Sequence, residues 1–117
     1  MATIWQQAEE LKDEMVERRR DLHRHPETGW TEFRTASMII GELKNLGYDV
    51  KFGDDVIDEK SMMGVPSEAE LADYMQRAIS EGADPELVKK MAGGKTGIVA
   101  TLKTDKPGKT VAFRFDM

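Results

Sequence analysis

The two histidines of the chain, His23 and His25, are the first side chains to consider as metal ligands. They lie two positions apart in the stretch RRRDLHRHPETGW. Helical metal sites place ligands at i and i+4, whereas residues two apart point to different sides of a helix. We therefore expect no chelate from this pair. The better interpretation is a histidine that binds carbonyl groups where a helix ends before Pro26.

The glycine-rich stretch GGKTG, residues 93–97, resembles part of a phosphate-binding loop. Such a loop requires another glycine five positions before Gly94, and this chain has Lys89 there. It also joins a strand to a following helix, whereas here a helix is expected before the glycines and a strand after them. The glycines are therefore expected to end a helix and turn the chain into a sheet.

Asp116 stands near the end of the stretch KTVAFRFDM. Val111, Phe113 and Phe115 alternate with other residues at the period of a strand with one buried face. A carboxylate at the end of a buried strand is costly unless it is paired or coordinated, and sites gather at strand ends in α/β sheets. An exposed terminal aspartate is the alternative, and the residues alone leave that choice open.

Composition restricts the class of protein. The chain has 117 residues, 17 basic and 22 acidic side chains, a net charge of -5 and no cysteine. This length predicts about one domain, without disulfides or thiolate metal sites. The acidic balance argues against a nucleic-acid partner, and the run Arg18 to Arg20 lies between acids, as on a solvated helix face. No signal peptide or membrane-length apolar run is visible, so we expect a cytoplasmic protein without a membrane partner.

Periodicity predicts the elements that would position these side chains. The expected helices are residues 3–24, with Thr3 and Gln6 as a capping box, and residues 31–46, closed by Gly47. Residues 48–52 are expected to form a strand in the same sheet as a C-terminal hairpin. The hairpin would pair residues 97–104 with 109–115 around a type II turn at Pro107 and Gly108. This is an α/β fold with a mixed sheet flanked by helices.

A helical insertion is expected at about residues 54–92. Ser67 with Glu70 forms a second capping box, and Asp84 followed by Pro85 is a typical helix start. We expect this segment to pack on the edge of the body without forming its core. Met62 and Met63 within it are not easily placed in a core and could line a contact surface.

Several motifs in order resemble a known family. The family pattern is R-R-x-L-H-x-x-P-E, then E-x-x-T, then L-G-Y. The chain matches it with Arg19, Arg20, Leu22, His23, Pro26, Glu27, Glu32, Thr35, Leu46, Gly47 and Tyr48. The stretches TGIVATL and KTVAFRFDM match a following block that continues R-x-D-M-D-A-L. Over nearly its whole length the chain resembles the metallo-amidohydrolases, a family of aminoacylase-type zinc peptidases, and its insertion is most like the p-aminobenzoyl-glutamate branch.

The resemblance implies an N-terminal portion of one metallohydrolase catalytic domain, ending inside the aspartate motif. Complete members hold two divalent metal ions, zinc or manganese, and cleave the amide of a small N-acyl amino acid. Their ligands and catalytic glutamate are expected after Met117, so this chain would contain no catalytic residue and would bind no metal pair alone. Asp116 would lie close to the metal site and orient a ligand. Substrate-binding residues are not identified, and assembly into a homo-oligomer stays open.

A second hypothesis from another class remains. The chain could be a small non-enzymatic binding module that shares ancestry with the family. Met62, Met63 and the insertion helices would then form its contact surface. The coding sequence after Met117 discriminates the two, because a continuation Asp-Ala-Leu favours the enzyme.

Overall fold

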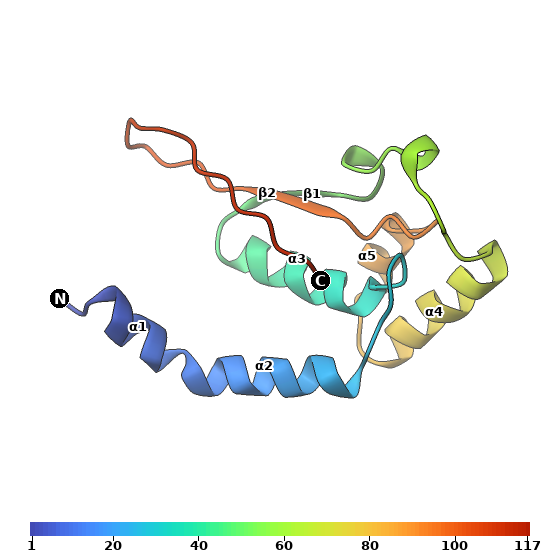
Figure 1. Cartoon of the computed structure of the whole chain (residues 1–117), viewed down its shortest axis with the longest axis horizontal. Helices are drawn as coiled ribbons and strands as arrows, with labels where there is room; N and C mark the ends of the chain where they lie inside the picture. Colours follow the sequence, from blue (N-terminus) through green and yellow to red (C-terminus); the bar gives the residue numbers. More distant parts are fainter.

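Helices dominate the architecture. A computed structural model describes all residues 1–117. The elements run α1 (Ile4–Glu10), α2 (Lys12–Arg24), α3 (Phe33–Asn45), β1 (Asp49–Phe52), α4 (Glu68–Ser80), α5 (Pro85–Lys90) and β2 (Ile98–Thr101), with short 3₁₀ turns at Gly53–Asp55 and Glu59–Ser61 (Figure 1). The α/β class is therefore confirmed. None of these helices is long and apolar enough to cross a membrane.

The sheet consists of β1 and β2, which pair antiparallel with Val50 opposite Ala100 and Phe52 opposite Ile98. Every second side chain of each strand is half-buried, so the sheet has one packed face and one exposed face. Val50, Phe52 and Ile98 pack against the core, and α3 contacts both strands. This is the alternation expected of a short strand that covers a helix.

Capping residues explain where the helices begin and end. The capping boxes at Thr3 and Ser67 are both formed, and Asp84 caps α5 with Pro85 in the first turn, as predicted. Gly47, at φ +88°, ends α3: its N–H donates to Lys44 O, and the N–H of Tyr48 donates to Leu43 O. This pair of hydrogen bonds is the Schellman motif, which requires a left-handed residue that glycine adopts without strain.

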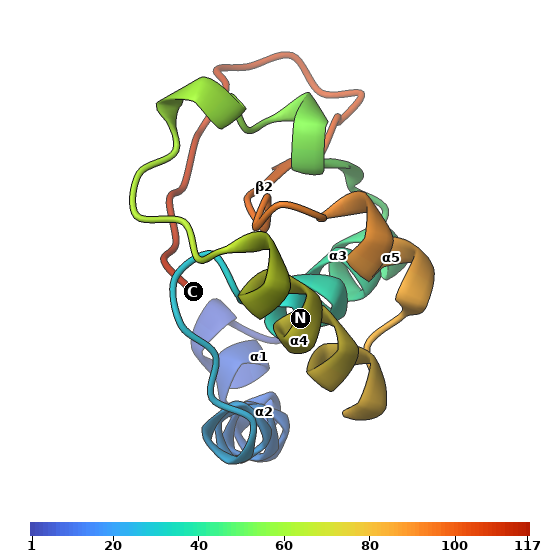
Figure 2. The same ribbon diagram turned by 90° about the vertical axis from the view of Figure 1, so that its right-hand side faces the viewer.

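The insertion is part of the core, contrary to the prediction that it packs only on an edge. Phe33, Ala36 and Ile40 of α3 are fully buried. The other members of the core cluster come from the inserted segment: Leu71, Ala78, Ala83, Val88 and Met91. Two four-residue strands cannot cover the apolar face of α3, so α4 and α5 cover the rest (Figure 2). Whether residues 54–92 form an inserted unit relative to other proteins stays a prediction.

The first predicted helix, residues 3–24, is interrupted. Leu11 ends α1, and its N–H donates to Ala8 O instead of continuing the i−4 ladder. No residue of α1 or α2 is buried, so no packed surface holds the two segments straight. Figure 1 shows α1 and α2 lying along one side of the body.

The structure does not contain the predicted C-terminal hairpin. The chain turns back after β2, but residues 102–117 contain no strand, and β2 pairs with β1 instead. The sheet is accordingly antiparallel, not mixed. Val111, Phe113 and Phe115 are 71%, 79% and 85% exposed. An alternating segment becomes a strand only where its apolar face has a surface to cover, and α3 already occupies the packed face of this sheet.

Candidate functional site

Polar side chains gather around the N-terminus of α3, where they form the most connected cluster of the chain. Glu32 occupies the N-cap position of α3, but its side chain makes no cap hydrogen bond. Glu27 caps the helix instead: its carboxylate accepts the N–H groups of Arg34 and Thr35, both at 2.8 Å, and the Thr35 hydroxyl at 2.7 Å. A carboxylate there satisfies free N–H groups and complements the helix dipole.

Arg34 joins three segments that lie far apart in the sequence. Its guanidinium donates to both carboxylate oxygens of Asp21 in α2, at 2.8 and 3.0 Å, and to the carbonyl of Glu81 at 3.0 Å. The hydrogen bond from Arg34 holds the pKa of Asp21 below its usual value. The bidentate pair ties α2 to α3, and the bond to the Glu81 carbonyl adds the end of α4. Sequence reasoning missed it, because the partners are separated by more than a helical turn and carry no local signal.

Two further links involve the residues just before β2, Lys95 and Thr96. Thr96, which is buried, donates its hydroxyl to Glu32 at 2.8 Å and so ties the start of α3 to the approach to β2. Lys95 donates to Asp54 and Glu59, which raises its pKa, chiefly through the bond to Asp54. The first contact ties the chain before β2 to the start of α3, and the second ties the same stretch to the turns that follow β1.

The structure separates the two histidines. Nδ1 of His25 lies 2.9 Å from Asp21 O and 3.3 Å from Asp21 Oδ1, and the residue caps the end of α2. His23 is exposed to solvent. The interpretation of a helix-terminating histidine is therefore confirmed.

The glycines of GGKTG turn the chain, as predicted. Gly93 and Gly94 both have φ +82° and lie between α5 and β2. A Cβ on Gly94 would lie 2.9 Å from Trp30 O, so only glycine fits there. Trp30 also donates its indole N–H to Met63 O at 2.8 Å; the Met63 side chain itself is 83% exposed, and Met62 is half-buried.

Asp116 lies in the exposed C-terminal segment, where it accepts a hydrogen bond from Arg114 at 2.8 Å. No three or more histidine, cysteine, aspartate or glutamate side chains converge as metal ligands in the structure. A pair of divalent ions needs several ligands at fixed geometry around each ion. The donor set of this chain therefore does not fit the two-metal centre that the resemblance implies.

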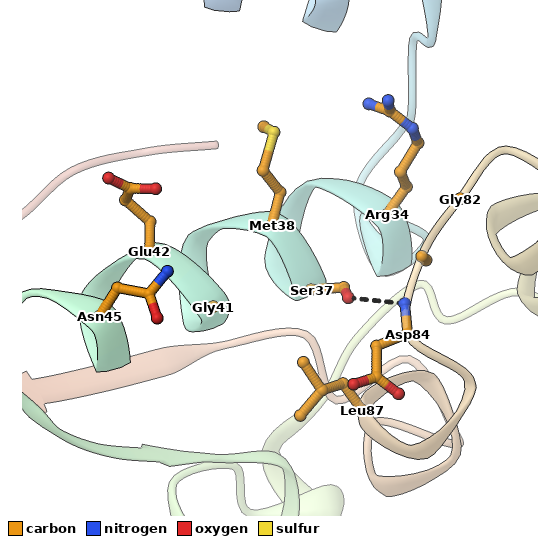
Figure 3. Close-up of a pocket in the computed structure, with 10 residues that line it drawn as sticks. Arg34, Ser37, Met38, Gly41, Glu42, Asn45, Gly82, Asp84 and Leu87 are labelled. Atoms are coloured by element: carbon orange, nitrogen blue, oxygen red, sulfur yellow. Dashed lines mark hydrogen bonds between the residues drawn. The ribbon is translucent and has the colours of Figure 1, made fainter.

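A depression of about 390 Å³ lies beside α3, between this helix and the segment that leads into α5 (Figure 3). Ser37 accepts the N–H of Asp84 at 3.1 Å across its floor. Arg34 at its rim is already paired with Asp21. Ser37 is thus engaged in holding α3 to the start of α5, and Arg34 in holding α3 to α2.

The chain is similar in sequence to hydrolases that are named for amino-acid conjugates. It is 51% identical over 108 residues to the indole-3-acetyl-aspartic acid hydrolase of Enterobacter agglomerans, a match that covers 92% of this chain and 25% of that protein. It is 43% identical over its whole length to one of the polypeptides of p-aminobenzoyl-glutamate hydrolase from Escherichia coli, covering 27% of that protein.

A solved structure agrees. The aminobenzoyl-glutamate utilization protein of Klebsiella pneumoniae superposes with a TM-score of 0.86 at 43% identity, over 92% of this chain and 27% of the other. The chain thus spans about a quarter of the length of the relatives it matches. No family model matches the chain. The predicted relationship to the p-aminobenzoyl-glutamate hydrolase branch is confirmed.

Proposed function

We propose that the chain is the N-terminal portion of the catalytic domain of a metal-dependent amidohydrolase. The complete enzyme would cleave the amide between an acyl or aroyl group and an amino acid, with p-aminobenzoyl-glutamate as the first candidate substrate. The observation that carries the proposal is the 51% and 43% identity to two hydrolases named for such conjugates. Cytoplasmic location and two zinc or manganese ions in the complete enzyme belong to the same proposal.

The role of this chain within the enzyme is to support the active site, and it provides no catalytic residue. Glu27, Arg34 and Glu32 are engaged in capping α3 and in linking it to α2, α4 and β2. Residues 54–92 are proposed as a helical insertion of this branch. Asp116 would lie close to the metal site and orient a ligand without binding substrate.

A chimera tests the proposal. The part of the E. coli p-aminobenzoyl-glutamate hydrolase polypeptide that this chain matches is replaced by the chain, and the protein is produced with the other components its activity needs. We expect hydrolysis of p-aminobenzoyl-glutamate that depends on zinc or manganese. The same enzyme without any N-terminal part is the control. A folded chimera that hydrolyses neither p-aminobenzoyl-glutamate nor indole-3-acetyl-aspartate would contradict the proposal.

A further inference from the structure

The connection between β1 and α4, residues 53–66, is exposed or half-exposed along nearly its whole length. It contains two short 3₁₀ turns and no α-helix or strand, and Gly53 is its one buried residue. The backbone hydrogen bonds of its turns are local and are donated by the N–H groups of Val56, Ile57, Ser61 and Met62. Figures 1 and 2 show the connection on the side of the body away from α2. Few buried residues and local hydrogen bonds are typical of a segment that opens without global unfolding.

Lys95 of the GGKTG stretch binds the first part of this connection. Its ammonium donates to the carboxylates of Asp54 and Glu59. The Lys95 side chain is 13% exposed, whereas those of Asp54 and Glu59 are 80% and 79% exposed. Ion pairs with such exposed carboxylates are weakened by salt. Ile57 lies against the same stretch, since a Cβ on Gly97 would be 2.6 Å from Ile57 Cδ1. This end of the connection is therefore held by salt-sensitive ion pairs and one apolar contact.

Trp30 binds the second part of the connection. Its indole N–H donates to Met63 O at 2.8 Å. Trp30 has φ +69° and is the only residue other than glycine with a positive φ, which is an unfavourable conformation for a bulky side chain. The buried Thr31 exchanges two hydrogen bonds with Thr28, at 2.8 and 3.1 Å, and these hold the turn in which Trp30 lies. The surrounding structure thus maintains the strained residue whose side chain reaches the connection.

We propose that residues 53–63 form a strap that is fastened at Lys95 and Trp30 and opens as one unit, while the core of α3, α4 and α5 stays folded. The two fastenings differ chemically, because one consists of ion pairs and the other is a neutral hydrogen bond. Opening uncovers Ile57 and the backbone of Gly97, and it displaces the exposed side chain of Met63. The inference goes beyond the proposed function, since it concerns the chain whichever amide the complete protein cleaves.

Distances between spin labels test the strap. The chain has no cysteine, so two introduced cysteines carry the only labels. Lys60→Cys with Ala92→Cys measures the distance from the strap to the body, and Gln76→Cys with Ala92→Cys measures a distance within the body; all three residues are exposed. We expect one narrow distance distribution for each pair at low salt. Raising sodium chloride from about 0.02 M to about 0.5 M should add a longer distance to the first pair and leave the second unchanged.

Each fastening can be removed by a single substitution. Lys95→Met removes the charge and keeps an unbranched side chain, whereas Trp30→Phe keeps an aromatic ring and removes the N–H donor. We expect each variant to increase the population of the longer strap distance at low salt by about threefold or more. The effect of salt should disappear in Lys95→Met and persist in Trp30→Phe, because only the first removes the ion pairs.

Matched control variants lie in α1 and α2. Lys12→Met removes a surface ion pair with Glu9, and Trp5→Phe changes an exposed tryptophan, so both should leave the two distances as they are in the unaltered chain. Circular dichroism in urea verifies that each protein is folded. An unchanged strap distance in both fastening variants, or an equal effect of the control variants, overturns the inference. A body distance that lengthens together with the strap distance when salt is raised does so as well, because the connection would then open only with the core.

Discussion

At the scale of residues, Glu27 shows how a family-motif residue can have a structural role. Its carboxylate accepts three hydrogen bonds at the start of α3, a helix whose own N-cap side chain makes none. We predict that Glu27→Ala lowers the free energy of unfolding by about 1–2 kcal/mol, the usual value of a cap. Urea denaturation followed by circular dichroism measures the loss. Glu10→Ala, at an exposed residue of α1, should change stability by less than about 0.5 kcal/mol.

The Asp21–Arg34 pair predicts a pH dependence of stability. The folded state lowers the pKa of Asp21, chiefly through the hydrogen bond from Arg34, so the folded state favours the ionised carboxylate. Its contribution is therefore complete above the unfolded pKa of about 4 and is lost as pH falls through the lower folded pKa. We predict that Asp21→Asn is less stable than the unaltered chain at pH 7 and that the difference narrows below about pH 4.

Thermal unfolding of Asp21→Asn and of the unaltered chain measures this difference in stability. The measurements run from about pH 2 to pH 8, a range that includes the titration of carboxylates. Nδ1 of His25 lies 3.3 Å from the same carboxylate, so His25→Gln is the variant that separates the two groups. A difference between Asp21→Asn and the unaltered chain that stays constant down to the acid end would show that ionisation of Asp21 does not stabilise the fold.

At the scale of elements, one glycine is required by a turn, whereas another lies inside a helix where alanine would fit. Gly94 has φ +82° and no room for a Cβ beside Trp30 O, whereas a Cβ on Gly41, inside α3, would meet nothing within 4 Å. We predict that Gly94→Ala destabilises the fold by more than about 1 kcal/mol, and that Gly41→Ala stabilises it by about 0.5–1 kcal/mol. The midpoints of urea denaturation of the two variants, each compared with that of the unaltered chain, test both predictions. Two changes in the same direction would contradict this account of the turn.

The inserted helices should unfold together with α3, since they share one core. Met91, directly after α5, and Ile40 of α3 are both completely buried in the same cluster. We predict that Met91→Ala and Ile40→Ala each cost about 2–5 kcal/mol, as truncations in a shared core do. If Met91→Ala left the free energy of unfolding nearly unchanged while Ile40→Ala lowered it, the result would favour an insertion that packs only on an edge.

At the scale of the whole molecule, the chain should not perform the chemistry of its relatives by itself. No three potential ligands converge, and in the depression beside α3 both Arg34 and Ser37 are already engaged in hydrogen bonds. We predict no hydrolysis of p-aminobenzoyl-glutamate and well under one tightly bound ion per chain after dialysis against zinc or manganese. Elemental analysis and a substrate assay measure both, with the chimera described above as control. Near two ions per chain, or turnover comparable to the chimera, would show that the active site lies within these residues.

Local sequence signals determined the ends of the helices. The capping boxes at Thr3 and Ser67, the start at Asp84 and Pro85, and the stop at Gly47 are all formed as predicted. Each depends on hydrogen bonds between residues that are close in the chain, so a short stretch contains the whole of the physical cause. The motif that relates the chain to the hydrolases could likewise be recognised in the sequence.

Only the tertiary structure decided which surfaces are buried and which segments pair. Local patterns cannot show that α4 and α5 complete the core of α3, that Arg34 reaches Asp21, or that β2 pairs with β1 across the intervening helices. The alternation of Val111, Phe113 and Phe115 specifies a strand, but a strand also needs a partner edge and an apolar surface. Pairing is a property of two surfaces, and the amino-acid pattern of one segment describes only one of them.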